Sequence, residues 1–153
     1  MKISDKFLKN NNFTHHQCIM LAVFCADKTI DIFEQAFPDF SEPRIALESA
    51  RKCAESMSSD NKQSAERAFK RGFSFMDSLP PTVEDKVRIS AGPSIYAAST
   101  ARRFSVETSY GGVMAAYLDA GYAIQLNTDS VAAKLEFREE FLKYALFLKR
   151  KGM

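Results

Sequence analysis

Three residues near the N-terminal end, His15, His16 and Cys18, have side chains that could bind a metal ion. His15 and Cys18 are three residues apart, so they would share one face of a helix, and imidazole and thiolate are both zinc ligands. A structural zinc site needs four ligands, however, and the chain holds no other histidine, while Cys25 and Cys53 lie among alanines and leucines. We expect no metal site and interpret the histidines as solvent-exposed residues at the start of a helix.

Cys25 is the best-placed candidate for a covalent nucleophile. A catalytic thiol needs a base or a cation beside it to form the thiolate, but Cys25 lies among Ala22, Ala26 and Thr29. That pattern favours packing in a core. The three cysteines are an odd number and all lie on apolar helix faces, which predicts free buried thiols in a reducing compartment. We expect that the protein is not an enzyme.

Gly111 and Gly112 precede an apolar segment, where backbone amides can hold a phosphate group. A phosphate-binding loop would also need a preceding strand and a lysine-serine pair or a third glycine, and the sequence has none of these there. We therefore expect the two glycines to break a helix. Arg103 and Glu107 are four residues apart, which is typical of a solvated ion pair. No cofactor is predicted.

Five carboxylates and one aromatic side chain gather around an expected helix-to-helix turn: Asp27, Asp31, Glu34, Phe40, Asp39 and Glu42. The first three share one helical face by their spacing of four and three residues. Solvation of a polar face is one interpretation. The other is a site that binds a partner, in which the carboxylates guide approach and the ring of Phe40 supplies buried area.

The chain around these residues predicts a helical hairpin. Small or apolar side chains recur at three-and-four spacing from about Thr14 to Phe37, which indicates one long helix. Pro38 cannot continue it. Ser41 suits the cap of the next helix, and Pro43 suits its first turn. That second helix should run from about Pro43 to Met57, with Arg44, Glu48 and Arg51 on its outer face.

The rest of the chain also predicts helices. We expect further segments at about 60–76, 94–109, 113–126 and 130–149, with a short charged segment at 82–89 that forms one or two turns. The expected fold is an all-α antiparallel bundle of about six helices, with a single domain over residues 13–153 and a flexible polar tail over residues 1–12. A helical-repeat solenoid is the competing architecture, but no fixed period is found.

Composition narrows the classes of partner. The chain has 153 residues, of which 46% are hydrophobic, enough for one core. Its 21 basic and 19 acidic side chains leave a net charge of +2, which does not favour direct nucleic-acid binding. No segment approaches the roughly 20 apolar residues of a membrane span. The apolar run that ends at Asp27 has no small-residue cleavage site, so we expect a cytoplasmic protein.

The hairpin resembles the start of a family of immunity proteins from bacterial polymorphic-toxin loci, the fifth numbered family of that kind. The similar features are an acidic phenylalanine segment at Phe33 and Glu34, the Pro38 and Asp39 turn, and a proline-arginine pair at Pro43 and Arg44. Glu42 stands where the family has a first arginine. The resemblance covers roughly residues 17–54 and the alanine-rich residues 94–126. It implies a small helical protein that binds a cognate toxin domain and blocks it without catalysis.

One part of the family pattern is missing. Members often carry histidines in the alanine-rich half, where this chain has Phe104 and Tyr110, so no role of those histidines is carried over. The six residues around the turn are the expected toxin-binding site.

Two alternatives remain open at the level of sequence. The alanine- and glycine-rich helices could leave a pocket for a small molecule, which would make the protein a ligand-binding or sensory domain. That pocket would be lined by four tyrosines: Tyr96, Tyr110, Tyr117 and Tyr122. The same small-residue helices could instead form the face of a homodimer.

Overall fold

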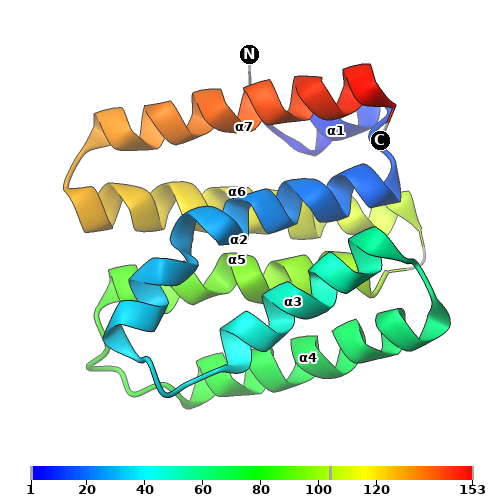
Figure 1. Ribbon diagram of the computed structural model, residues 1–153. Helices are drawn as coiled ribbons and strands as arrows, with labels where there is room; N and C mark the ends of the chain where they lie inside the picture. The colour runs from blue at the N-terminus through cyan, green and yellow to red at the C-terminus, as the bar shows by residue number, and fades with distance from the viewer. Residues whose placement is uncertain (1, 104, 153) are drawn as a thin grey trace.

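The computed structural model describes residues 2–103 and 105–152, and Met1, Phe104 and Met153 lie outside this part of the chain. All regular structure in the described residues is helical, and the predicted all-α bundle is confirmed (Figure 1). The helices are α1 (Asp5–Asn10), α2 (His15–Ala36), α3 (Glu42–Glu55), α4 (Ser59–Ser78), α5 (Asp85–Ala101), α6 (Val106–Thr128) and α7 (Val131–Lys151).

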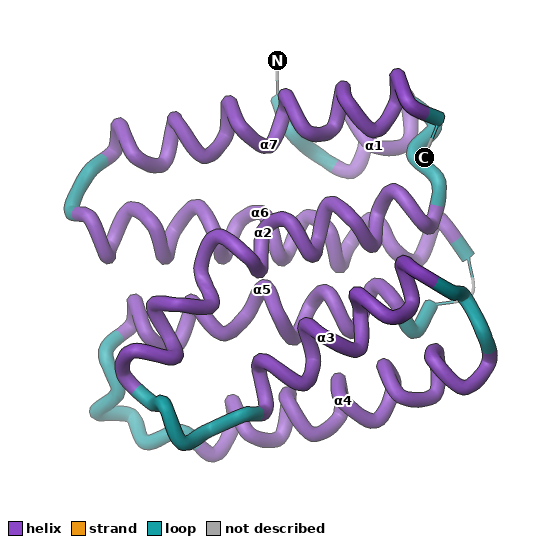
Figure 2. Tube along the Cα trace, in the orientation of Figure 1, coloured by secondary structure: helices purple, strands orange, loops and turns teal. Residues whose placement is uncertain are grey.

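Helix α5 is the centre of the bundle. It packs against α2, α3, α4 and α6, while α7 covers α6 and α2, and short loops connect most of the helices (Figure 2). The largest buried cluster takes apolar side chains from all seven helices. Two smaller clusters extend it, one around Phe33 and Leu79 and one around Ala46 and Ile95. No helix in the described part of the chain is both long and apolar enough to cross a membrane.

The sequence predicts separate segments at 82–89 and 94–109, with a break between them at Gly92 and Pro93. This break is wrong, because α5 continues through both residues. Proline has no N–H to donate and crowds the preceding turn, so an interior proline is costly unless packing compensates. Pro93 is fully buried here. The nearby carbonyl of Ser90 accepts a hydrogen bond of 3.2 Å from the Thr29 hydroxyl of α2. The contact with α2 thus stabilises the middle of α5, where the sequence predicts a break.

The expected break at Gly111 and Gly112 is also wrong, since both lie inside α6. The connection falls earlier, after Ala101. Gly112 has a packing role, because a Cβ at this position would overlap the Thr100 hydroxyl of α5. Gly111 faces open space. The expected helical pair of Arg103 and Glu107 therefore straddles the connection between α5 and α6.

Part of the segment predicted as a flexible tail, residues 1–12, is helical and packed against the bundle. Residues 5–10 form α1, and the Ser4 hydroxyl caps this helix by accepting from the backbone N–H of Phe7. Ile3, Phe7 and Leu8 are buried in the main cluster. The sequence does not predict α1, because its six residues are too few to show a helical periodicity.

Candidate binding surface at the α2–α3 turn

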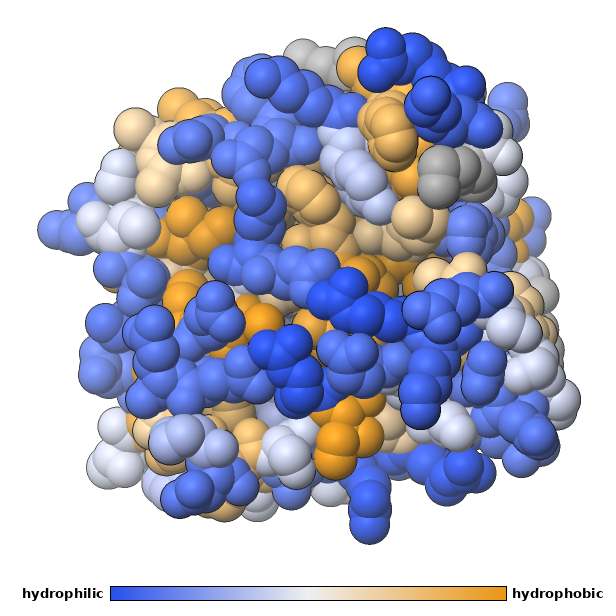
Figure 3. All heavy atoms as spheres, viewed as in Figure 1, coloured by the Kyte–Doolittle hydropathy of each residue, from blue (hydrophilic) through white to orange (hydrophobic). Residues whose placement is uncertain are grey.

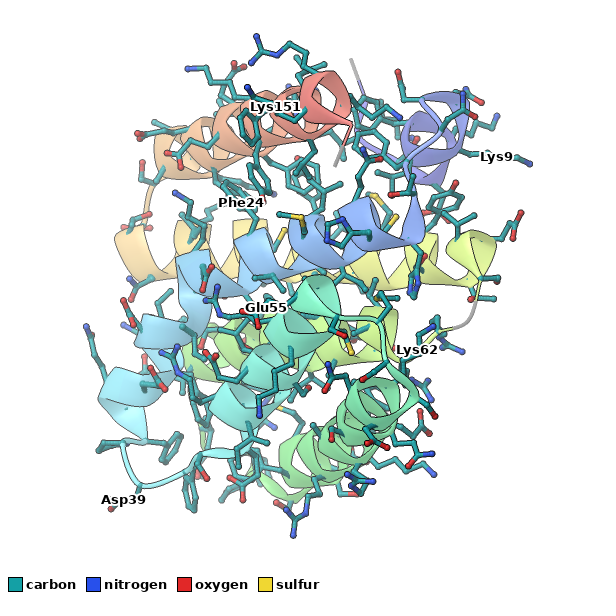
Figure 4. All side chains as sticks on the ribbon, turned by 45° about the vertical axis from the view of Figure 1, so that its right-hand side comes forward. Lys9, Phe24, Asp39, Glu55, Lys62 and Lys151 are labelled. Atoms are coloured by element: carbon teal, nitrogen blue, oxygen red, sulfur yellow. The ribbon has the colours of Figure 1, made fainter. Side chains whose placement is uncertain are left out.

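The helical hairpin forms close to its predicted bounds. Helix α2 ends at its C-cap, Phe37, and α3 starts after Ser41 with Pro43 in its first turn. Ser41 holds the expected cap position, but its side chain makes no capping hydrogen bond. Asp39 lies at the tip of the connection and points away from the protein (Figure 4). The turn therefore projects from one end of the bundle, where a partner can reach it.

Two of the predicted acidic residues are paired across the hairpin. Arg44 of α3 donates to both carboxylate oxygens of Glu34 on α2, from Nε at 3.0 Å and from Nη2 at 2.5 Å. Hydrogen bonding to Arg44 lowers the pKa of Glu34, and the same bond raises the pKa of Arg44. About two helical turns farther from the hairpin turn, Arg51 of α3 forms an ion pair with Asp27 of α2 and also contacts Glu48 at 3.3 Å.

These pairs change the electrostatic character of the predicted site. The acidic face of α2 is neutralised in part by arginines of α3, so it is not a continuous negative patch. A sequence signal for this pairing exists. Asp27 and Glu34 on the first helix are seven residues apart, and so are Arg44 and Arg51 on the second. In an antiparallel hairpin, residues at equal distances from the turn face each other, so Glu34 can meet Arg44 and Asp27 can meet Arg51. Sequence reasoning placed the arginines on the outer face of α3 and missed their partners.

Phe40 lies at the edge of an aromatic cluster. Its ring centroid is 5.5 Å from that of Phe37 and 5.2 Å from that of Phe75 on α4. Phe33, fully buried, completes the cluster by contacting Phe37 and Phe75. Phe40 itself remains 43% exposed. The turn therefore presents an aromatic side chain whose position is set by rings behind it.

A groove of about 660 Å³ lies beside the turn, between the start of α3 and the second half of α4. Glu42 and Ile45 line one side, and Lys70, Arg71 and Phe75 line the other. One carboxylate oxygen of Glu42 is buried and has no hydrogen-bond partner among the residues that the structure describes. Asp31 and Asp39 are exposed. Of the predicted site residues, Asp39, Phe40 and Glu42 lie together at the turn, whereas Asp27 lies farther along α2, where it pairs with Arg51 of α3.

The histidines are not the solvent-exposed pair that the sequence predicted. The Nε2 atom of His15 lies 2.9 Å from the Thr100 carbonyl, and that of His16 lies 2.8 Å from the Ala54 carbonyl. Each histidine thus ties the start of α2 to another helix. Burial lowers the pKa of His15. Within the described residues, no three His, Cys, Asp or Glu side chains form a group that could hold a metal.

The three cysteines are free and buried, as predicted. Burial raises the pKa of the Cys18 thiol to about 11 and raises the pKa of Cys25 further. A thiol with a raised pKa forms little thiolate at neutral pH. These side chains therefore act as small apolar residues in the core.

A second hollow, of about 810 Å³, lies at the opposite end of α4 and was not anticipated from the sequence. Lys62, Arg102 and Arg103 line it together with Ser105 and other polar residues. Figure 4 shows Lys62 beside the connection between α5 and α6. Lys62 donates to the Arg103 carbonyl at 3.0 Å, and Arg102 donates to Glu66 at 2.8 Å. These contacts tie α4 to Arg102 and Arg103, which follow the end of α5.

A third hollow of about 420 Å³ lies on the face shown in Figure 3, between α2, α3 and α7. Hydrophilic atoms cover much of this face, and hydrophobic atoms show between them (Figure 3). Phe24 points from α2 towards α7 (Figure 4) and stacks on Tyr144 with ring centroids 4.9 Å apart. Phe24 and Tyr144 thus connect α2 to α7 and form part of the wall of this hollow.

Among the described residues, none of the hollows found is lined by more than one of the four tyrosines of the alternative interpretation. Tyr110 is buried and donates to the Phe13 carbonyl at 3.4 Å, whereas Tyr122 is exposed. Tyr117 packs on Phe141, with ring centroids 4.8 Å apart. Ala97, Ala116 and Ala120 are buried where α5 and α6 pack together, so within the described residues these small side chains do not form an open face.

Comparisons of the chain with protein-family models, curated proteins and solved structures find no match.

Proposed function

We propose that the protein is an immunity protein that binds a cognate bacterial toxin domain and blocks it without catalysis. The observation that carries this proposal is the half-exposed ring of Phe40, held by Phe37 and Phe75 beside a groove. A preorganised aromatic side chain loses little conformational entropy on binding and makes an effective anchor. The resemblance of residues 17–54 to an immunity family supports the same function.

The charges around the turn suggest the chemistry of the partner surface. Arg44 and Arg51 offset Glu34 and Asp27, which leaves Asp31, Asp39 and Glu42 as the acidic groups nearest the turn. Across the groove, Lys70 and Arg71 carry the opposite charge. The proposed partner is therefore a toxin surface with an apolar projection that enters the groove, ringed by charges of both signs. We place this complex in the cytoplasm, with neither nucleic acid nor membrane as a direct ligand.

Neutralising a toxin that kills at low copy number requires tight binding. A nanomolar dissociation constant corresponds to about 12 kcal/mol. An interface that buries roughly 800 Å² on each partner can reach this value if it contains a few strong anchors. Phe40 and the apolar part of the groove, Ile45 and Phe75, are the anchors that we propose.

The test uses the toxin-like domain that this proposal predicts to be encoded beside the protein, produced as an inactive variant. Isothermal titration calorimetry should give a nanomolar dissociation constant for the wild-type chain. Phe40→Ala should raise it about 10- to 100-fold, because the ring supplies a central contact. Phe73→Ala is the matched control, since Phe73 is 52% exposed on α4 but does not line the groove.

The two levels of the proposal fail differently. Absence of binding by the wild-type chain would contradict the immunity function. Tight binding that Phe40→Ala leaves unchanged would contradict only the binding surface at the α2–α3 turn. Growth rescue of cells that express the active toxin gives a second readout, and it should follow the same order of variants.

A further inference from the structure

Helices α6 and α7 carry an exposed apolar face that the core does not require. Of the eleven large hydrophobic side chains that are exposed in the described residues, seven lie on these two helices, and all of these but Phe147 fall in two matching stripes. We call this the α6–α7 face: Leu118, Tyr122, Leu126, Val131, Leu135 and Leu146. Their exposed fractions run from 38% for Leu126 to 61% for Leu118.

Helical spacing places each set on one side of its helix. Leu118, Tyr122 and Leu126 follow one another at intervals of four on α6. On α7, Val131 and Leu135 are four residues apart, and Leu146 returns to the same side three turns later. The two stripes are adjacent, because Leu118 and Leu135 border the same small hollow of about 60 Å³.

The core uses a different side of α7. Phe137, Phe141, Ala145 and Leu148 are buried against the rest of the bundle. The exposed stripe is therefore additional to the residues that attach α7. Together the six side chains expose on the order of 500 Å² of surface, which is near the upper end for the largest apolar patch of a monomer.

We infer that the α6–α7 face binds a second copy of this chain in a two-fold symmetric dimer. A two-fold interface uses the same patch on both subunits, so one apolar face is sufficient to close the assembly. Two antiparallel helix pairs with leucines at four-residue intervals can interlock as ridges and grooves. The face supplies more than half of the roughly 800 Å² per partner that a standard interface buries.

The rim of the face suits this symmetric contact. Lys134 and Arg138 line the hollow between Leu118 and Leu135, and Glu136 is exposed beside Leu135, so charges of both signs border the two stripes. Opposite charges can then meet across a two-fold axis, whereas a strongly charged foreign surface would favour a rim of one sign. The dimer does not depend on the proposed immunity function, since no residue of the α2–α3 turn belongs to the face.

The test is sedimentation equilibrium of the full chain from low-micromolar to near-millimolar concentration. The wild-type protein should reach twice the 17.2 kDa mass of one chain. Leu118→Glu and Leu135→Glu should each raise the dissociation constant about 100-fold or more, because each places a charge in both halves of the interface. Phe73→Glu is the matched control, since it adds the same charge at a similarly exposed site on α4 and should leave the dimer intact.

Circular dichroism of each variant checks that the helices persist, and Leu118→Ser and Leu135→Ser replace any variant that unfolds. A monomer at every concentration would overturn the proposal, as would a dimer that both glutamate variants leave intact. Hydrogen exchange identifies other occupants. If the wild-type chain is monomeric and its α6–α7 face is protected only after the toxin domain or lipid vesicles are added, the face belongs to that partner and not to a second copy.

Discussion

The α5–α6 seam and the α2–α3 end of the bundle are built from opposite kinds of side chain. Helices α5 and α6 meet through small residues with no exposed surface, among them Ala97, Ala116 and Ala120. The α2–α3 end relies on phenylalanine rings and arginine-carboxylate pairs, and it leaves Phe40 partly exposed. Substitutions that enlarge a side chain should therefore destabilise the α5–α6 seam most, and substitutions that shorten a side chain should destabilise the α2–α3 end most. The first region sets the approach of the central helices, and the second can present a surface to a partner.

The largest expected effect comes from removing the inner ring of the aromatic end. Phe33 is fully buried and contacts Phe37 and Phe75, so Phe33→Ala should lower the free energy of unfolding by about 3–5 kcal/mol through the cavity that it leaves. Phe40→Ala should lower it by about 1 kcal/mol or less, since that ring is already half in water. Urea unfolding followed by circular dichroism measures both. Equal losses would show that the outer ring is structural and would weaken its assignment to a partner.

The next effect tests added volume at the seam with two adjacent glycines. Gly111→Ala should raise the free energy of unfolding by about 1 kcal/mol, because it improves helix propensity in open space. Gly112→Ala places its Cβ on the Thr100 hydroxyl and should cost about 1–2 kcal/mol despite the same gain in propensity. Thermal unfolding of the two variants gives the difference directly. Similar values for both would mean that the seam relaxes easily.

The same glycines show what sequence could and could not predict. The all-α class, the hairpin and the buried cysteines follow from local periodicity and from proline chemistry at Pro38 and Pro43. The breaks predicted at Gly92 and Gly111 rest on local rules that tertiary packing overrides. Close approach of α5 to α6 makes glycine necessary at position 112, and no pattern within one helix reveals which neighbour comes close.

The candidate site divides in a similar way. Sequence placed Asp39, Phe40 and Glu42 at the turn, because those positions depend on where two helices end. It did not place Phe75 behind Phe40, or Arg71 across the groove, because both belong to α4 and their position depends on how α4 packs against α3. The aromatic support of the proposed anchor is therefore a tertiary feature.

Asp119 provides a pH-dependent test of the seam. Its carboxylate packs so close to Gly92 that a Cβ there would overlap it, and burial raises the pKa of Asp119 from 3.8 to about 6. The unfolded chain ionises this group at lower pH, so stability should fall as the pH rises from about 4 to about 6 and then stay lower. Asp119→Asn should raise the free energy of unfolding by about 1–2 kcal/mol at neutral pH, a value reduced to allow for partial exposure, with little change near pH 3. Urea unfolding across this pH range checks it, and a constant difference between the two proteins would contradict the assignment.

The smallest expected effect lies at the α2–α3 end, where Glu34 pairs with Arg44. Hydrogen bonding to Arg44 lowers the pKa of Glu34, so the pair stabilises the fold above the ordinary glutamate pKa and loses this contribution as the pH falls through the lowered value. Both side chains are about one-third exposed, and Glu34→Gln should therefore cost only about 0.5–1 kcal/mol at neutral pH. The cost should shrink in high salt and vanish in strong acid. A loss as large as that of Phe33→Ala would show that this ion pair stabilises the α2–α3 end as much as the aromatic rings do, which would contradict the division between a structural aromatic core and a solvated ion pair.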